Sequence, residues 1–422
     1  TTELAWQALY GRAVLIRPPR FNPADKQVWQ VIVAPGFACA LEMDAASRGS
    51  MAINFARRRI LLTGPTASGD LRRALFLVQG LLLPEKDVLP MRCAASMGED
   101  GRTALFFGQT GSGKTTLAMD ASRHLIGDDA HAWSRNGVFN LEGGCQTGCA
   151  DLSPADQPLV WNAIRFGALL ENVSLDELRE PDYAVLREGV VPSCAFPLEH
   201  LDHHVPENRG NAPSVIVFLT CDLSGVLPLV ARLDSRSAVS YFLCGYSMQP
   251  EAHEDPPATG FSVCFADDLL PRPPRVYAEL LLKKLASYGT RAFLVNTGWT
   301  GSPERGRRIP LAAVRSVIGA FLKGDLNDCE TTRLALFNLE IPASLAGVDA
   351  ALLAPAEAWQ DEAAYTLQAT RLAQTLAARM GDFADLPKEI VVAGAQAPTP
   401  ESDTGTAPTE PSPSEAPVIP EQ

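Results

Sequence analysis

A glycine-rich segment that ends in one lysine and two threonines is the part of the sequence best suited to chemistry. Residues 108–116 read GQTGSGKTT and follow the apolar run TALFF. The spacing matches the phosphate-binding pattern G-x-x-x-x-G-K-T, and an ordinary glycine turn is the alternative. Glycines let backbone N–H groups converge on phosphate oxygens, Lys114 would reach the β and γ phosphates, and the Thr115 hydroxyl would hold Mg²⁺. The residues expected to bind ATP here are Gly108, Gln109, Thr110, Gly111, Ser112, Gly113, Lys114, Thr115 and Thr116.

Two adjacent carboxylates follow the next short apolar run. Asp128 and Asp129 close the segment HLIGDD, fourteen and fifteen residues after Lys114. Carboxylates at the end of a strand beside a phosphate loop are typical of a metal site or of a general base. A capping or turn role is the alternative for such a pair. We therefore expect Thr115, Asp128 and Asp129 as metal ligands, with the two aspartates also as candidate catalytic groups.

The elements that must position these residues alternate between strand-like and helical patterns. Short apolar runs predict strands, and apolar spacing of three and four residues predicts helices. The chain is therefore expected to be a mixed α/β protein. The predicted strands are residues 103–107, 214–220, 241–243 and 292–295, and the predicted helices are residues 277–287 and 312–321.

Composition limits the classes of function. The 422 residues carry 36 basic and 49 acidic side chains, a net charge of −13, which argues against a protein that wraps nucleic acid. Nine cysteines, an odd number, fit reduced thiols and a cytoplasmic setting. The longest apolar stretch, residues 74–83, is too short to span a bilayer, so no membrane association is expected. Residues 395–422 hold seven prolines and five acids without a basic residue, which predicts a disordered acidic tail.

Four blocks of sequence resemble the ATP-dependent phosphoenolpyruvate carboxykinase family. They are FFGQTGSGKTTL at 106–117, LIGDDAHAW at 125–133, GVFNLEGGC at 137–145 and FLVNTGW at 293–299. The resemblance implies a two-lobed α/β fold with a mononucleotide-binding C-terminal lobe, and conversion of ATP and oxaloacetate to phosphoenolpyruvate and carbon dioxide. It divides the chain into a reduced N-terminal lobe (1–90), a nucleotide-binding catalytic lobe (91–392) and the tail (395–422). It also adds Arg308 to the nucleotide-binding residues.

The chain departs from this family at the second metal, usually Mn²⁺. By resemblance, a lysine, a histidine and the second aspartate of the acidic pair hold that ion, and the corresponding residues here are Arg73, Arg92 and Asp129. A guanidinium stays protonated and has no free lone pair, so it cannot bind a metal. The second metal site is therefore expected to be lost. The family arginine near the substrate corresponds to Ser193, the family lysine near the nucleotide corresponds to Gly148, and the N-terminal lobe is expected to be much shorter than in the family.

These departures lead to three hypotheses. The leading one is a phosphotransferase that moves the γ-phosphoryl group of ATP to an acceptor other than oxaloacetate, either a small molecule or a protein side chain. Arg73 and Arg92 would clamp the phosphoryl group or an anionic acceptor, and Asp129 would be the candidate base. The second hypothesis is an authentic carboxykinase with rebuilt sites, and the third is a non-catalytic nucleotide-binding regulator. Residues 249–260 occupy the place of the family's mobile lid.

Overall fold

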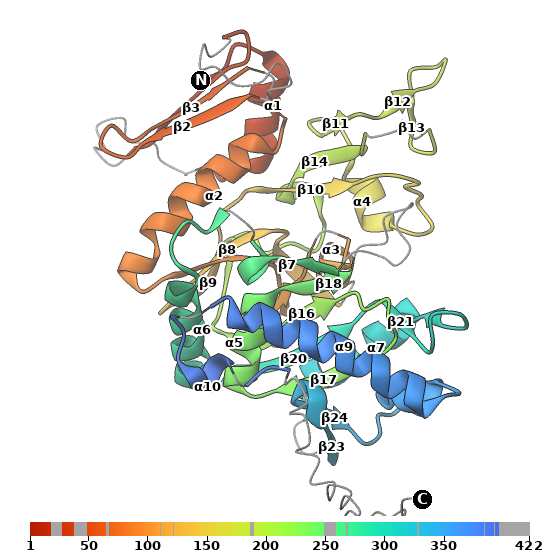
Figure 1. The fold of residues 1–422 in the computed structure, drawn as a ribbon. Helices are drawn as coiled ribbons and strands as arrows, with labels where there is room; N and C mark the ends of the chain where they lie inside the picture. Colours follow the sequence, from red (N-terminus) through yellow and green to blue (C-terminus); the bar gives the residue numbers. More distant parts are fainter. Residues whose placement is uncertain are drawn as a thin grey trace, which may run out of the picture.

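The computed structural model describes most of the chain and shows a mixed α/β protein built around one large sheet (Figure 1). The sheet has the strand order β23-β24-β17-β20-β16-β6-β5-β7. Its strands are β5 (Ala94–Gly98), β6 (Thr103–Phe107), β7 (Arg123–Gly127), β16 (Pro213–Thr220), β17 (Val230–Leu233), β20 (Arg291–Asn296), β23 (Thr331–Leu334) and β24 (Leu339–Pro342). The described residues are 1–17, 28–37, 49–64, 67–109, 111–120, 122–185, 190–248, 259–266, 269–326, 329–383, 385–391 and 393–395.

Helices cover both faces of this sheet because its central strands are apolar on both sides. In β6 and β16, Phe107 and Phe218 belong to one buried cluster, whereas Phe106 and Val217 belong to another. Successive side chains of a strand point to opposite faces, so the two clusters lie on opposite sides of the sheet. The first cluster includes residues of α5 (Ser235–Cys244), α6 (Pro274–Tyr288) and α9 (Glu362–Gly381), and the second includes residues of α3 (Lys114–Ala118) and α7 (Leu311–Lys323).

The strand directions place the glycine-rich segment and the acidic pair at one edge of the sheet. Strand β16 is parallel to β6 and to β20, and β5 is antiparallel to both β6 and β7. Strands β6, β7, β16 and β20 therefore end on the same side. The phosphate loop follows β6 and the acidic pair follows β7, so both lie at this carboxyl edge, where open α/β sheets bind ligands.

Two smaller sheets build the wall of the same region. One has the order β15-β9-β8-β4, and the other has the order β10-β14-β11. Arg92 ends β4 and pairs with Ala130, the residue directly after Asp129, which brings the two charged side chains together. The strands are β4 (Leu89–Arg92), β8 (Ala130–Ser134), β9 (Gly137–Asn140), β10 (Gly144–Gly148), β11 (Leu169–Glu171), β14 (Ser193–Pro197) and β15 (Arg209–Gly210).

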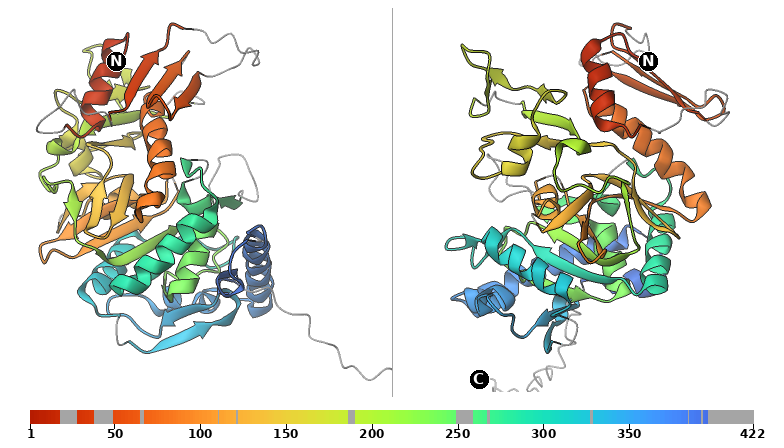
Figure 2. Two further views of the ribbon diagram at one scale, coloured as in Figure 1. Left: turned by 90° about the vertical axis from the view of Figure 1, so that its left-hand side faces the viewer. Right: turned by 180° about the vertical axis from the view of Figure 1, so that it is seen from behind.

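The N-terminal elements form a small layer at one end of the molecule, and helix α2 runs from this layer toward the large sheet (Figures 1 and 2). Ile60 and Leu62 pack against Ala74 and Val78 of that helix. The first helix, α1, packs against β10 and β14, where a side chain at Gly144 would lie 2.2 Å from a backbone oxygen of α1. The elements are α1 (Ala5–Val14), β1 (Gln30–Ala34), β2 (Ser50–Asn54), β3 (Arg59–Thr63) and α2 (Asp70–Leu82).

The remaining short elements join or flank these layers. Among them, β18 and β19 form a two-stranded sheet beside the end of β16. The bounds are α4 (Pro158–Ala163), β12 (Ser174–Leu175), β13 (Pro181–Asp182), β18 (Tyr246–Met248), β19 (Thr259–Phe261), β21 (Trp299–Thr300), β22 (Arg307–Arg308), α8 (Ala350–Leu353) and α10 (Lys388–Val391).

One predicted strand is wrong. Residues 241–243 lie inside helix α5, which begins after Asp234 and ends at Gly245. The Asp234 carboxylate accepts hydrogen bonds from two backbone N–H groups of the first turn, and Gly245 takes the left-handed conformation common at helix ends. A short apolar run fits either element, so these end signals should have decided the assignment. The three other predicted strands and both predicted helices are confirmed, with each end within three residues of the predicted one.

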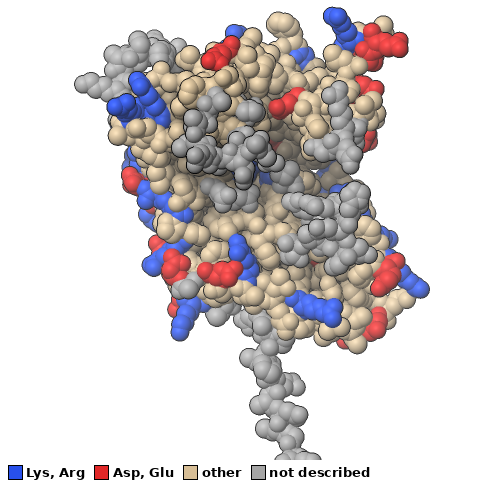
Figure 3. Space-filling model, turned by 45° about the horizontal axis from the view of Figure 1, so that its top comes forward, with Lys and Arg blue, Asp and Glu red and all other residues tan. Residues whose placement is uncertain are grey.

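Several predictions concern parts of the chain that the structure describes only partly or not at all. Thr110, residues 249–258 of the expected lid and residues 396–422 of the expected tail lie outside the described residues. The division of the chain near residue 90 stays a prediction. No described helix is both long and apolar enough to cross a membrane. On the face shown in Figure 3, basic and acidic side chains are interspersed.

Candidate functional site

The glycine-rich segment that the sequence predicts to bind phosphate connects β6 to α3. Gly111 and Gly113 have φ angles of +84° and +89°, which only glycine adopts without strain. The Lys114 ammonium donates hydrogen bonds to the carbonyl oxygens of Gly108 and Gln109, at 2.6 and 3.2 Å. The Ser112 hydroxyl is buried and has no hydrogen-bond partner within the described residues. This hydroxyl packs against Gly108, where a side chain would lie 2.2 Å from the hydroxyl oxygen.

The first aspartate of the acidic pair faces the loop. The Thr115 hydroxyl donates a hydrogen bond of 2.6 Å to Asp128 Oδ1. Burial raises the pKa of Asp128, and the Thr115 hydrogen bond partly offsets that shift. A hydroxyl and a carboxylate oxygen this close to a phosphate cradle are suitable ligands for Mg²⁺, which binds few protein oxygens and otherwise takes phosphate oxygens and water.

The second aspartate is paired with arginine. Arg92 donates hydrogen bonds of 2.9 and 3.2 Å to Asp129 Oδ2, and Arg72 Nη2 lies 3.7 Å from the same oxygen. Burial acts to raise the pKa of Asp129, but the two guanidinium charges and Lys114 outweigh it and hold the pKa well below its usual range. Asp129 is therefore a stable anion and a weak proton acceptor.

Arg72 is the centre of a wider polar network. Its Nε donates a 2.7 Å hydrogen bond to Glu142 Oε1, its Nη2 bonds the other oxygen of the same carboxylate, and its Nη1 donates to Gln146 Oε1 at 3.3 Å. The same Gln146 oxygen accepts a hydrogen bond of 2.7 Å from the Tyr10 hydroxyl. Burial raises the pKa of Glu142, and the charge of Arg72 partly offsets the shift. The network joins α1 and α2 to the loop between β9 and β10.

The cavities show which predicted residues come together. Lys114, Thr115, Asp128, Asp129 and Arg92 line one cavity of about 470 Å³. Its other lining residues are Arg72, Gln109, Gly111, Gly113, Thr116, Gln146, Thr147 and Gly148.

The two other predicted arginines lie in neighbouring cavities. Arg73 lines an adjoining cavity of about 190 Å³ together with Arg72 and Arg92. Arg308 lines a third cavity of about 510 Å³, on the side of the loop that carries Ser112. All predicted site residues within the described chain therefore lie in or beside one cleft.

The sequence prediction missed Arg72, Glu142, Gln146 and Tyr10. The assignment by resemblance selected Arg73, whereas the helix directs Arg72 into the network and leaves Arg73 exposed at the rim. The sequence carries no signal that separates the two arginines, because Arg72 and Arg73 lie four and three residues before Phe76 and both spacings share one face of a helix. Glu142 lies within the GVFNLEGGC block, but the block alone does not predict its pairing with Arg72.

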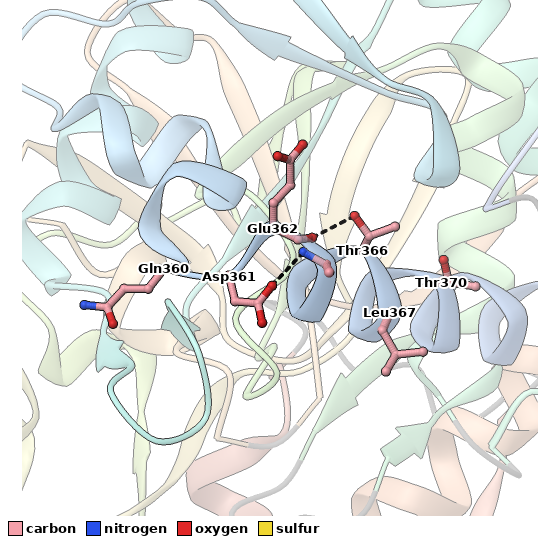
Figure 4. A pocket seen from close by; sticks show the side chains of 7 residues that line it. Gln360, Asp361, Glu362, Thr366, Leu367 and Thr370 are labelled. Atoms are coloured by element: carbon pink, nitrogen blue, oxygen red, sulfur yellow. Dashed lines mark hydrogen bonds between the residues drawn. The ribbon is translucent and has the colours of Figure 1, made fainter.

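A separate hollow beside the start of α9 lacks these features (Figure 4). There, Asp361 accepts hydrogen bonds from backbone N–H groups of the first turn, and the Thr366 hydroxyl donates to the Glu362 carbonyl oxygen. These bonds cap and stabilise the helix end and leave no converging charged groups. The described residues contain no group of three or more His, Cys, Asp or Glu side chains that could hold a metal ion.

Comparison with known proteins identifies the family of this chain. A family model described as phosphoenolpyruvate carboxykinase matches residues 1–351. A phosphoenolpyruvate carboxykinase (ATP) 2 of Moorella thermoacetica is 42% identical over 400 residues, which is 93% of this chain and 76% of the relative. The phosphoenolpyruvate carboxykinase (ATP) of Caldanaerobacter subterraneus is 42% identical over 405 residues, 93% of this chain and 77% of the relative. That of Bacillus pumilus is 40% identical over 399 residues, with 93% and 76% covered. The chain therefore belongs to the ATP-dependent phosphoenolpyruvate carboxykinase family.

Proposed function

We propose that this family member is an ATP-dependent phosphotransferase whose acceptor is not oxaloacetate. One observation carries the proposal: Arg92 donates two hydrogen bonds to Asp129, the residue that the family resemblance assigns to a second metal. A fixed guanidinium would then supply the positive charge at that position. The reaction with oxaloacetate relies on a metal ion that binds a carboxylate and an enolate, and a cleft with a guanidinium at this position suits that reaction less well.

The chain's residues fit one divalent ion better than two. Thr115 and Asp128 offer two oxygens beside the phosphate cradle. Asp129 is already bonded to Arg92 and lies next to Arg72, and like charges would repel a second cation. We therefore propose Mg²⁺ at Thr115 and Asp128, with Asp129 contributing its charge, and no Mn²⁺ site at Asp129.

The proposed mechanism relies on positioning and on charge. The loop N–H groups and Lys114 would bind the phosphates, with the ammonium moving from its carbonyl partners to the phosphate oxygens. When bound, Mg²⁺ would neutralise charge on those phosphates. Arg92 would stabilise negative charge that develops on the transferred group, and Asp129 would hold Arg92 in place. This assignment replaces the earlier hypothesis of Asp129 as base, because a carboxylate with a lowered pKa accepts protons weakly.

An authentic carboxykinase is the second candidate. The 42% identity over 93% of the chain to proteins named phosphoenolpyruvate carboxykinase (ATP) favours it. A regulatory protein that binds ATP without turnover is the third. The arginines in place of the two metal ligands are the observation that separates the first candidate from the second.

The test follows the fate of γ-labelled ATP. The full chain is incubated with labelled ATP, Mg²⁺ or Mn²⁺, and either oxaloacetate or a metabolite extract that also contains protein. The proposal expects label in a product other than phosphoenolpyruvate, and no label transfer by the Lys114→Met variant. Stoichiometric formation of phosphoenolpyruvate and carbon dioxide from oxaloacetate would establish the carboxykinase. ATP binding without any labelled product would establish the regulator.

A further inference from the structure

The second residue of the phosphate loop is tied to a distant part of the chain. The side-chain amide of Gln109 donates hydrogen bonds to the carbonyl oxygens of Gly245, at 2.6 Å, and Gly260, at 3.2 Å. A primary amide nitrogen has two hydrogens, and these two carbonyls account for both. Gln109 lines the 470 Å³ cavity, but its amide N–H groups point to protein carbonyls and not into the cavity.

The two carbonyls belong to a well-anchored support. Gly260 pairs with Ser247 between β19 and β18, and Met248 N donates to the Cys221 carbonyl oxygen at 2.8 Å, just beyond the end of β16. Gly245 has a φ of +52°, and a side chain there would lie 1.8 Å from a backbone oxygen. The position of the Gly245 carbonyl is therefore fixed by its conformation and by its neighbours.

The main chain of Gln109 connects this support to the catalytic lysine. Its carbonyl oxygen accepts hydrogen bonds from Lys114 Nζ and from Ser112 N, both at 3.2 Å. Movement of Gln109 would therefore shift the first turn of the loop and the groups that meet the phosphates. The side-chain bonds restrain that movement.

We infer that Gln109 is a positioning residue that holds the phosphate loop in its binding conformation through the Gly245 and Gly260 carbonyls. It would act on the bound phosphates through the loop, because its side-chain amide N–H groups bond protein carbonyls. The inference rests on the ATP binding in the proposed function. It adds a specific consequence. Loss of the two Gln109 side-chain hydrogen bonds should weaken nucleotide binding most for the nucleotides whose phosphates the loop must hold.

The test compares ATP, ADP and AMP by isothermal titration calorimetry with the full chain and Mg²⁺. Gln109→Leu keeps a similar volume and removes both hydrogen bonds, whose loss is expected to weaken ATP and ADP on the order of tenfold or more. AMP affinity should fall less than ATP affinity, since AMP lacks the β and γ phosphates that Lys114 would hold. Gln109→Glu should be worse than Gln109→Leu, because a carboxylate facing two carbonyl oxygens is repelled. Gln374→Leu, an exposed site on α9, is the matched control.

The outcomes separate this inference from the proposed function. Unchanged ATP affinity in Gln109→Leu, or equal losses for ATP, ADP and AMP, would overturn the positioning role. Thermal unfolding of each variant accompanies the titrations, and a loss for ATP with an unchanged melting temperature supports the role. A wild-type protein that transfers no phosphoryl group, yet shows the ATP-selective loss in Gln109→Leu, would refute the proposed transfer and support the inference.

Discussion

Replacing Arg72 by methionine removes the charge at the centre of the polar network while keeping most of the side-chain length. Arg72 pairs with Glu142 through two hydrogen bonds and lies 3.7 Å from Asp129, and the Arg72 and Glu142 side chains are only 10% and 8% exposed. Removing one partner of a buried ion pair leaves the other charge uncompensated and costs about 3–5 kcal/mol. The matched control is Arg102→Met. Arg102 pairs with Asp100 at 2.6 Å, but both side chains are nearly half exposed, so its loss should cost at most about 1 kcal/mol.

Urea denaturation, followed by tryptophan fluorescence and circular dichroism, measures the free energy of unfolding of each variant. The comparison is valid if the fluorescence and circular dichroism signals change over the same range of urea concentration, as two-state unfolding requires. Adding Glu142→Gln to Arg72→Met should restore much of the lost stability, because the unpaired charge is gone. The deficit of Arg72→Met should also shrink at acidic pH, since burial raises the pKa of Glu142 and a protonated carboxyl needs no counter-charge. An Arg72→Met cost no larger than that of Arg102→Met, or no recovery in the double variant, would refute the buried-network interpretation.

Three further predictions concern the loop, the core beside it and the metal. Lys114→Met should weaken ATP binding about a hundredfold in calorimetry, because two hydrogen bonds to a charged group are worth about 3 kcal/mol together; unchanged affinity would contradict the phosphate-loop assignment. His131 is a buried residue of β8. Burial lowers its pKa from 6.5 to about 4, so the unfolded chain takes up this proton first as the pH falls. The free energy of unfolding should therefore drop by roughly 3 kcal/mol between these two pH values, and the drop should be smaller in His131→Asn. Equal drops in wild type and variant would contradict the lowered pKa of His131. The double variant Arg73→Lys with Arg92→His should bind one more Mn²⁺ than wild type in electron paramagnetic resonance titrations, and equal stoichiometry would show that the arginines are not what excludes the ion.

The sequence predicted the phosphate loop and the acidic pair because their chemistry restricts both residue type and spacing. A glycine-rich turn between strand and helix has few other uses, and Lys114, Thr115, Asp128 and Asp129 do line one cavity. The three confirmed strands are apolar on both faces, a pattern typical of the centre of a covered sheet. The sequence was therefore sufficient where the residues that define a motif or a strand lie within one short segment.

The rest depended on contacts between distant segments. Which of Arg72 and Arg73 faces the cleft depends on how α2 packs, and the ion pair with Glu142 spans 70 residues of sequence. The pairing of Arg92 with Asp129 follows from the register of β4 and β8, which the sequence does not specify. Tyr10 reaches Gln146 across 136 residues, and no motif marks either residue. Pairings of this kind are set by tertiary packing, so a single sequence could identify the charged residues but not their partners.

The ion pair between Arg92 and Asp129 has a consequence for how the protein would respond to its surroundings. A metal ion in a cleft is exchanged with the medium, so chelators and shortage of that metal change the charge of the site. A guanidinium is bonded to the chain and remains protonated at any pH at which the protein is folded. The positive charge beside Asp129 is therefore part of the protein itself, and it does not depend on the supply of manganese.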